Sequence, residues 1–303
     1  MSLFLQLRQR LSLFNELVAF EHSVFALPFA LSGSLLAAAP ALGPNWLALA
    51  WVVGCMVSGR TFAMGLNRIL DARIDAQNPR TAGRPIPSGR VSSAAAWAIT
   101  LTAGLALYAC TAQLPPLCLQ LLPVVYVVLG VYSLTKRFTS LCHLVLGLAL
   151  GISAIGGWMA VTGSWNQGLP VLFGLAILCW VAGFDIIYAC QDEAFDRDHG
   201  LHSLPAWLGA QTALSLSKGL HSLCLLVLLG FGVMYQRIWQ PVTPTHWGYW
   251  LGCGIMAALL YRQHTLVSAT NLSRVNVAFF TTNGWASVLF LASLLLERAL
   301  EGV

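Results

Sequence analysis

The aspartates of this 303-residue chain are concentrated in two short windows, residues 67–75 and 185–198. The chain contains six of them: Asp71, Asp75, Asp185, Asp192, Asp196 and Asp198. In the first window Asn67, Asp71 and Asp75 are spaced by four. A helix through this window places all three side chains on one face, about 6 Å apart along the axis.

The second window has the same character. Its oxygen-bearing side chains follow at intervals of three, four and four, and so share a helical face: Asp185, Tyr188, Asp192 and Asp196. Carboxylates that face one another in a partly buried site repel strongly, and a divalent cation removes that cost. Hard oxygen ligands in this number suit Mg²⁺, which is commonly shared between one or two carboxylates and a phosphate.

A stiff basic segment follows the first window. The stretch AQNPRTAGRPIPSGRVS carries Arg80, Arg84 and Arg90 among prolines and glycines that prevent a continuous helix. Guanidinium groups bind phosphate oxygens through paired hydrogen bonds. Acids, Mg²⁺ and neighbouring arginines together predict a diphosphate site, whereas Arg90 is assigned to anchoring at the membrane surface.

The composition identifies the surroundings of this site. Hydrophobic residues make up 57% of the chain and charged residues 9%, and the mean hydropathy is +0.73. Soluble domains are about 25% charged, so a water-soluble fold is excluded. Disorder is excluded as well, because the chain has 11 Trp, 14 Phe and 7 Tyr. An integral membrane protein remains.

Apolar stretches of about 20 residues, the length that crosses a bilayer, occur nine times. They lie near residues 22–40, 45–65, 94–112, 116–134, 141–162, 169–190, 212–234, 246–262 and 278–296. We therefore expect an all-α, polytopic membrane bundle forming a single domain over residues 1–303. Residues 1–21 are expected to form an amphipathic lead-in, and segments 66–92 and 191–211 to form cytoplasmic loops that carry the two windows.

The positive charges give the orientation. With the N-terminus in the cytoplasm, all 16 Lys and Arg residues except Arg237 and Arg298 fall on the inner side. Lys136 and Arg137 are interpreted as part of this topology signal. The net charge of +5 then requires no nucleic acid. We expect a location in the cytoplasmic (inner) membrane, with lipid around the bundle and no obligate protein partner.

Both windows match a known family. NRILDARIDAQNPRTAGRPIPSG resembles the first aspartate-rich motif of the UbiA superfamily of intramembrane prenyltransferases, and DIIYACQDEAFD followed by GLHSLPAWLG resembles the second. The resemblance covers roughly residues 15–290. Two positions depart from the usual pattern: Arg68 follows Asn67, where the motif has Asn-Asp, and His202 replaces a common Lys. With FEHSVFALPFA and LSRVNVAFFTTNG, these departures resemble the branch in the futalosine route to menaquinone.

The resemblance implies a nine-span bundle whose cavity binds a polyprenyl diphosphate, with the head group on Mg²⁺ and the tail among apolar helices. By position, it implies that the metal and diphosphate are organised by Asn67, Asp71, Asp75, Asp192 and Asp196. The expected diphosphate contacts are Arg73, Arg80, Arg84 and His202. Candidates for the reacting centre are Asp185 and Tyr188, with Asp75, Asp185 or the released diphosphate as base, and candidates for the acceptor end are Glu21 and His22.

The resulting expectation is Mg²⁺-dependent transfer of a polyprenyl group to a hydroxylated aromatic acid, with 1,4-dihydroxy-6-naphthoate as acceptor. The alternative within the family is 4-hydroxybenzoate, for ubiquinone. An ion or proton-coupled transporter is the alternative of another class, because carboxylates near a membrane also bind ions or relay protons. His143, His221, His246 and His264 are expected to be structural.

Overall fold

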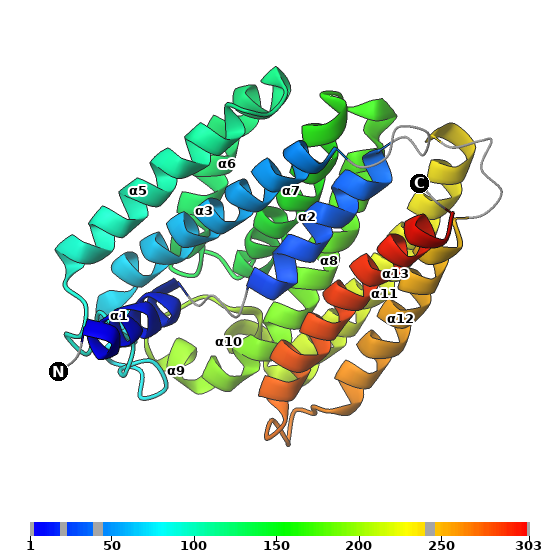
Figure 1. The fold of residues 1–303 in the computed structure, drawn as a ribbon. Helices are drawn as coiled ribbons and strands as arrows, with labels where there is room; N and C mark the ends of the chain where they lie inside the picture. Colours follow the sequence, from blue (N-terminus) through cyan, green and yellow to red (C-terminus); the bar gives the residue numbers. More distant parts are fainter. Residues whose placement is uncertain (1–2, 19–22, 39–44, 240–245, 302–303) are drawn as a thin grey trace.

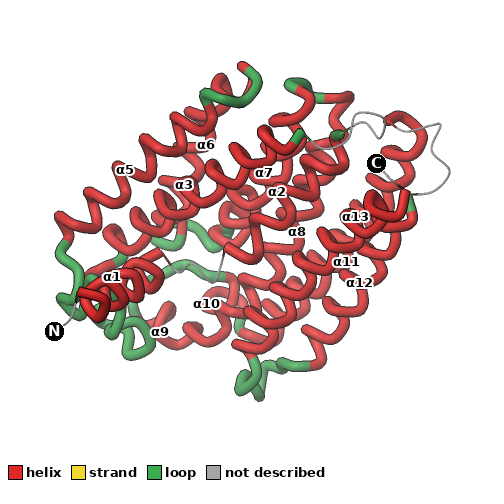
Figure 2. Tube along the Cα trace, viewed as in Figure 1, coloured by secondary structure: helices red, strands yellow, loops and turns green. Residues whose placement is uncertain are grey.

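A computed structural model describes residues 3–18, 23–38, 45–239 and 246–301. The described chain is helical throughout, and its β-pairing is limited to an isolated bridge between Ser268 and Asn271 (Figure 2). Nine of the helices occur at the nine predicted positions. They are α2 (Ser23–Ala37), α3 (Trp46–Leu70), α5 (Ser93–Thr111), α6 (Pro116–Thr135), α7 (Cys142–Thr162), α8 (Leu169–Ala189), α11 (Ala210–Met234), α12 (Trp247–Thr265) and α13 (Asn283–Glu301).

Within the described residues, seven helices are long and apolar enough to cross a membrane, by length and composition alone. The exceptions are α2, which has 15 residues, and α12, which carries Arg262, Gln263 and His264 in its last turn. The prediction of nine spans therefore holds for the positions of the helices, and seven of them have the expected length and hydropathy.

Local sequence signals explain where the helices begin and end. The Asn45 side chain accepts a hydrogen bond from the Ala48 amide and caps α3, and Ser92 caps α5 through the Ala95 amide. Pro116 occupies the first turn of α6, where its missing N–H costs nothing. Gly163 ends α7 with a φ of 64°, a conformation that glycine adopts without strain.

The helices pack side by side along a common direction (Figure 1). In the view of Figure 1, α3, α5 and α6 form one side of the bundle, α2, α7 and α8 the middle, and α11, α12 and α13 the other side. Glycines allow α7 to approach its neighbours closely. A Cβ on Gly147 would lie 2.5 Å from the Leu178 carbonyl oxygen of α8, and one on Gly157 would overlap the Ala30 carbonyl of α2.

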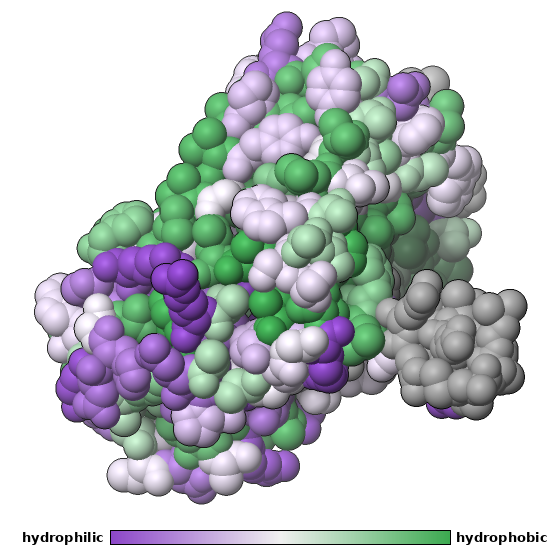
Figure 3. Space-filling model, turned by 90° about the vertical axis from the view of Figure 1, so that its left-hand side faces the viewer, coloured by the Kyte–Doolittle hydropathy of each residue, from purple (hydrophilic) through white to green (hydrophobic). Residues whose placement is uncertain are grey.

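The outer surface and the interior are both apolar. Trp158, Trp180 and Phe173 are fully buried, whereas Trp46, Leu105 and Leu226 expose 65–73% of their surface. Figure 3 shows apolar residues over most of one flank and hydrophilic residues gathered mainly toward its lower end. An apolar flank of this extent suits lipid rather than water, as expected for a multi-pass membrane protein.

The hydrophilic end is built from short elements. Helices α1 (Leu3–Val18), α4 (Ala72–Asp75), α9 (Glu193–Asp198) and α10 (Leu204–Leu208) lie here, together with the turns of residues 76–92 (Figure 1). The first window and the second both reach this end of the bundle.

Candidate active site

The two acidic windows meet in one polar cavity of about 240 Å³. Its wall includes Asn67, Asp71 and Asp75 from the first window, and Asp185, Tyr188 and Asp192 from the second. The structure thus brings together side chains that are more than 100 residues apart in the chain.

The chain changes direction at Asp71, within the first window. Helix α3 ends at Leu70, Asp71 has φ −91° and ψ 1°, and α4 continues to Asp75. The Asp75 amide donates to the Asp71 carbonyl, so the helical path is nearly continuous and the predicted common face is kept. Asn67 donates from Nδ2 to the Asp71 carboxylate at 2.8 Å.

The cavity-lining residues of the second window begin on α8 and end in a 3₁₀ turn. Asp185 and Tyr188 lie in the last turns of α8, and Asp192 closes the 3₁₀ turn Cys190–Asp192 that follows. The Tyr188 ring stacks on Phe279 with centroids 4.1 Å apart, and its hydroxyl accepts from Arg80 at 3.3 Å. Tyr188 therefore has a fixed orientation in the cavity wall.

The carboxylates at this end are paired with permanent cations. Arg80 binds both oxygens of Asp192, at 3.0 and 2.5 Å, and Arg84 Nη1 binds both oxygens of Asp75, at 2.6 and 2.7 Å. Arg137 binds Asp71 at 3.0 Å. Burial raises the pKa of the Asp71 carboxyl above its ordinary value, and Arg137 offsets only part of that shift.

These pairs neutralise the acids before any ligand arrives. Within the described residues, no group of three or more His, Cys, Asp or Glu side chains is arranged closely enough to hold a metal ion. The aspartate side chains are 8–9% exposed at Asp75 and Asp192, whereas Arg84 and Arg80 are 26% and 33% exposed. The cations therefore have more freedom to move away than the acids do.

Asp185 has a different partner. Its Oδ2 lies 2.6 Å from Nδ1 of His143, a residue of α7 that is almost fully buried. The other ring nitrogen of His143 faces the Leu204 amide at 3.3 Å. His143 was expected to be structural, but it lines the cavity beside Asp185.

Several predicted residues lie outside the cavity wall. Arg73 is exposed, and His202 is also exposed, with its backbone N–H donating to the Lys136 carbonyl. Asp196 lies behind the wall with a side chain that is 0% exposed, because Lys136 Nζ binds it at 2.7 Å and Ser203 Oγ donates to it at 2.8 Å. The predictions for Glu21 and His22 lie outside the described residues.

Some residues of the cavity were not predicted from the sequence. Asn78 donates to Asp192 at 3.2 Å and accepts from the Arg80 amide, so it braces the basic loop against the second window. Lys136 and Arg137, from the α6–α7 connection, were attributed to topology alone, yet each binds an aspartate. The adjacent Lys-Arg pair was a signal, but only the fold places it opposite the acids.

Arg90 also has a larger role than membrane anchoring. Its guanidinium binds both carboxylate oxygens of Glu16 on α1, at 2.7 and 2.6 Å, and it donates to the Gly83 carbonyl. Gly83 directly precedes Arg84. Arg90 therefore links α1 to the loop that carries the cavity arginines.

Replacing Lys136 by Met is expected to lower the free energy of unfolding by about 2 kcal/mol, because Asp196 would remain buried without its counter-ion. Denaturant titration of the purified protein measures the change. The double variant Lys136→Met/Asp196→Asn removes the uncompensated charge and should recover most of the loss. Equal stability of the wild type and Lys136→Met would contradict a stabilising role for this pair.

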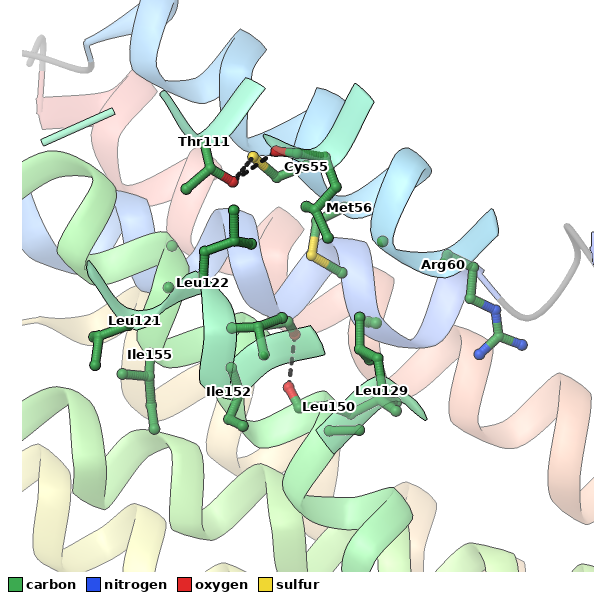
Figure 4. A pocket seen from close by; sticks show the side chains of 18 of the residues that line it. Cys55, Met56, Arg60, Thr111, Leu121, Leu122, Leu129, Leu150, Ile152 and Ile155 are labelled. Carbon is green, nitrogen blue, oxygen red and sulfur yellow. Dashed lines mark hydrogen bonds between the residues drawn. The ribbon is translucent and has the colours of Figure 1, made fainter. Parts of the chain in front are cut away.

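A second, apolar cavity of about 180 Å³ adjoins the polar one, and Tyr132 and Leu146 line both. Helices α3, α6 and α7 supply most of its wall, as Figure 4 shows for Met56, Leu122 and Ile155. Arg60 lies at one end of the residues drawn in Figure 4. Within the described part of the chain its guanidinium makes no hydrogen bond or ion pair, and its Nε is buried.

Comparisons with known proteins identify the family. The model of the UbiA prenyltransferase family matches residues 26–294. The mitochondrial 4-hydroxybenzoate polyprenyltransferase of Aedes aegypti is 30% identical over 76% of this chain, a match that spans half of that protein. The 4-hydroxybenzoate octaprenyltransferase of Methylobacillus flagellatus is 26% identical, over 95% of this chain and 94% of that protein.

Solved structures agree with this result. An apo UbiA homologue from Aeropyrum pernix K1 superposes with a TM-score of 0.81 at 31% identity, covering 91% of this chain and 98% of that one. A UbiA homologue from Archaeoglobus fulgidus bound to DMAPP and Mg²⁺ has a TM-score of 0.74 at 18% identity, covering 94% and 99%, and supports the fold alone. With the family match over most of its length and both acidic windows in one cavity, the chain belongs to the UbiA prenyltransferase family.

Proposed function

We propose that this protein transfers a polyprenyl group from a polyprenyl diphosphate to a hydroxylated aromatic acid in quinone biosynthesis. The observation that carries the proposal is the junction of two cavities. A polar cavity with aspartates and arginines opens beside an apolar one, so a diphosphate head and a hydrocarbon tail each have a chemically matched place. We further propose that the polar end faces the cytoplasm, as the distribution of Lys and Arg indicates.

The donors of the polar cavity fit Mg²⁺. Asn67, Asp71, Asp75 and Asp192 offer hard oxygens, and the Asn67 amide already donates through its nitrogen, which leaves its oxygen available. The Archaeoglobus fulgidus homologue, which has the same fold, is bound to DMAPP and Mg²⁺ in its structure. When bound, Mg²⁺ supplies positive charge that stabilises the leaving diphosphate.

The arginines take a complementary part. A cation bound by Asp75 and Asp192 replaces the charge that Arg84 and Arg80 supply in this structure, which frees both guanidinium groups for the diphosphate oxygens. Cleavage of the carbon–oxygen bond places extra negative charge on the diphosphate. Groups that bind the released diphosphate more strongly than the intact ester therefore lower the barrier.

The apolar cavity protects the reaction. Its aliphatic wall excludes water from the allylic cation that forms when the diphosphate departs, and the tail lies along α3, α6 and α7. Asp196, enclosed by Lys136 and Ser203, supports the wall behind Asp192.

4-Hydroxybenzoate is the acceptor that the relatives support best, because both curated relatives described above carry that activity in their names. The second candidate is 1,4-dihydroxy-6-naphthoate, which the departures at Arg68 and His202 favour. The structure gives those two residues local roles: Arg68 Nε donates to the Leu17 carbonyl, and His202 bonds through its backbone. Both acceptors carry a carboxylate, and we assign its binding to the Arg60 guanidinium, which makes no hydrogen bond or ion pair within the described residues.

Replacing Arg60 by Met is expected to raise KM for the aromatic acid roughly tenfold, because a charge-assisted hydrogen bond is lost. KM for the prenyl diphosphate should stay the same. Steady-state kinetics in lipid nanodiscs measures both, with Arg60→Lys as the variant that keeps the charge. A phenol without the carboxylate should not distinguish the variant from the wild type. If Arg60→Met affects the phenol as strongly as the acid, Arg60 does not bind the carboxylate.

A side-by-side assay tests the function itself. Purified protein receives Mg²⁺, one polyprenyl diphosphate, and either 4-hydroxybenzoate or 1,4-dihydroxy-6-naphthoate. Prenylated product from one acid in preference to the other identifies the acceptor. Ion uptake into proteoliposomes without prenyl turnover of either acid would overturn the proposal in favour of a transporter.

A further inference from the structure

Asp185 differs in its charge pairing from every other aspartate that lines the polar cavity. Asp71, Asp75 and Asp192 each bind an arginine. Within the described residues, the hydrogen bond from His143 is the one that Asp185 receives, and no Lys or Arg pairs with it. A guanidinium therefore engages each of the other three carboxylates, whereas one oxygen of Asp185 is engaged by His143 alone.

The hydrogen bonds of His143 define its protonation. Its Nε2 lies 3.3 Å from the Leu204 amide nitrogen, which can only donate. Nε2 is therefore the unprotonated nitrogen, and the ring proton is on Nδ1, 2.6 Å from Asp185 Oδ2. A neutral imidazole in this tautomer donates to an ionised carboxylate and holds it in one orientation.

The position of the pair is also specific. His143 is in the first turn of α7, Asp185 is near the end of α8, and Leu204 begins α10. The His143 side chain is 3% exposed, whereas that of Asp185 is 22% exposed and lines the cavity. One oxygen of Asp185 is thus occupied by His143, and the carboxylate remains accessible from the cavity.

We propose that Asp185 is the base that removes the ring proton of the aromatic acceptor and that His143 is its positioning residue. This inference rests on the proposed prenyl transfer. The carbon–oxygen bond of the diphosphate breaks with its electron pair on oxygen, and the acceptor ring carbon bonds to the prenyl carbon. The ring C–H bond then breaks, its electrons restore aromaticity, and the proton passes to Asp185 while His143 keeps its own.

The structure favours Asp185 over Asp75 for this step. Arg84 Nη1 binds both oxygens of Asp75, at 2.6 and 2.7 Å, so both oxygens of that carboxylate already hold a guanidinium. Tyr188, three residues after Asp185 on the same face, accepts from Arg80. Within the second window, Arg80 thus contacts Tyr188 and Asp192 but not Asp185, and we assign Asp192 to leaving-group binding and Asp185 to proton removal.

The test compares His143→Leu, His143→Asn and Asp185→Asn. Leucine has a similar volume but lacks the N–H group that donates to Asp185. The side-chain amide nitrogen of asparagine occupies the place of Nδ1 and keeps this donor. We expect His143→Leu and Asp185→Asn each to lower kcat roughly 100-fold, as for loss of a general base. His143→Asn should retain a large part of the activity that His143→Leu loses. KM for the prenyl diphosphate should remain near the wild-type value in all three variants.

An acceptor deuterated at the prenylated ring position provides the decisive readout. Proton removal becomes rate-limiting once the base is impaired, so a primary isotope effect on kcat should appear in His143→Leu and Asp185→Asn and be smaller in the wild type. His221→Gln is the matched control, because His221 is equally buried but lies outside both cavities. It should show the wild-type isotope effect.

The outcomes separate this inference from the proposed function. Wild-type protein without prenyl transfer overturns the function. Active wild type with an unchanged kcat in Asp185→Asn overturns Asp185 as the base. A fall in kcat of His143→Leu without a new isotope effect, or an equal fall in His143→Asn, overturns the positioning role of His143.

Discussion

Replacing Asp192 by asparagine is expected to lower prenyl transfer roughly 1,000-fold, a loss typical of removing a key electrostatic group from an active site. The variant removes a negatively charged ligand of the proposed Mg²⁺ site and leaves Arg80 without its partner. Both changes weaken the stabilisation of the departing diphosphate. Product formation from a radiolabelled polyprenyl diphosphate, measured in nanodiscs over a range of Mg²⁺ concentrations, gives the loss.

Asp198→Asn is the matched control. Asp198 belongs to the same acidic window, is exposed and lies outside the polar cavity, so its replacement should leave the rate unchanged. Thermal unfolding should show that both variants are folded. Activity of Asp192→Asn close to that of the wild type would remove Asp192 from the metal site.

Replacing Gly156 by Phe is expected to abolish the use of long prenyl diphosphates while short ones still react. Gly156 is on α7 and lines the apolar cavity, and a Cβ placed on it meets no heavy atom within 4 Å. The new ring therefore occupies space that the tail needs. Overpacking costs about 1–3 kcal/mol in a filled interior, whereas here the cost falls on the ligand. Competition between a ten-carbon and a forty-carbon diphosphate measures the selectivity.

The control is Gly130→Phe. Gly130 is also within a long helix and has equally open surroundings, but it is not among the residues that line either cavity. It should leave the preference for chain length unchanged. Equal use of both diphosphates by Gly156→Phe would place the tail elsewhere.

The sequence was sufficient to predict the helices and the meeting of the two windows. Hydropathy located the nine helices, because an apolar stretch forms the greater part of each. The four-residue spacing placed Asn67, Asp71 and Asp75 on one face, and the structure keeps that face despite the change of direction at Asp71.

The partners of the acids could not be predicted in the same way. Periodicity places Asp196 on the face of Asp192, but the 3₁₀ turn before α9 rotates it toward Lys136 and Ser203. Arg73 has the charge of Arg80 and Arg84, yet it lies on the exposed side of α4. Contacts between α7 and α8 determine that His143 reaches Asp185, and no local pattern encodes a pair 42 residues apart.

The hydrogen bonds of Arg90 connect the N-terminal helix α1 to the polar cavity. Glu16 on α1 holds Arg90, Arg90 holds the Gly83 carbonyl, and the next residue is Arg84. A truncation that removes Glu16 would therefore remove the carboxylate that binds Arg90. The first helix thus fixes, through Glu16 and Arg90, the segment that directly precedes Arg84.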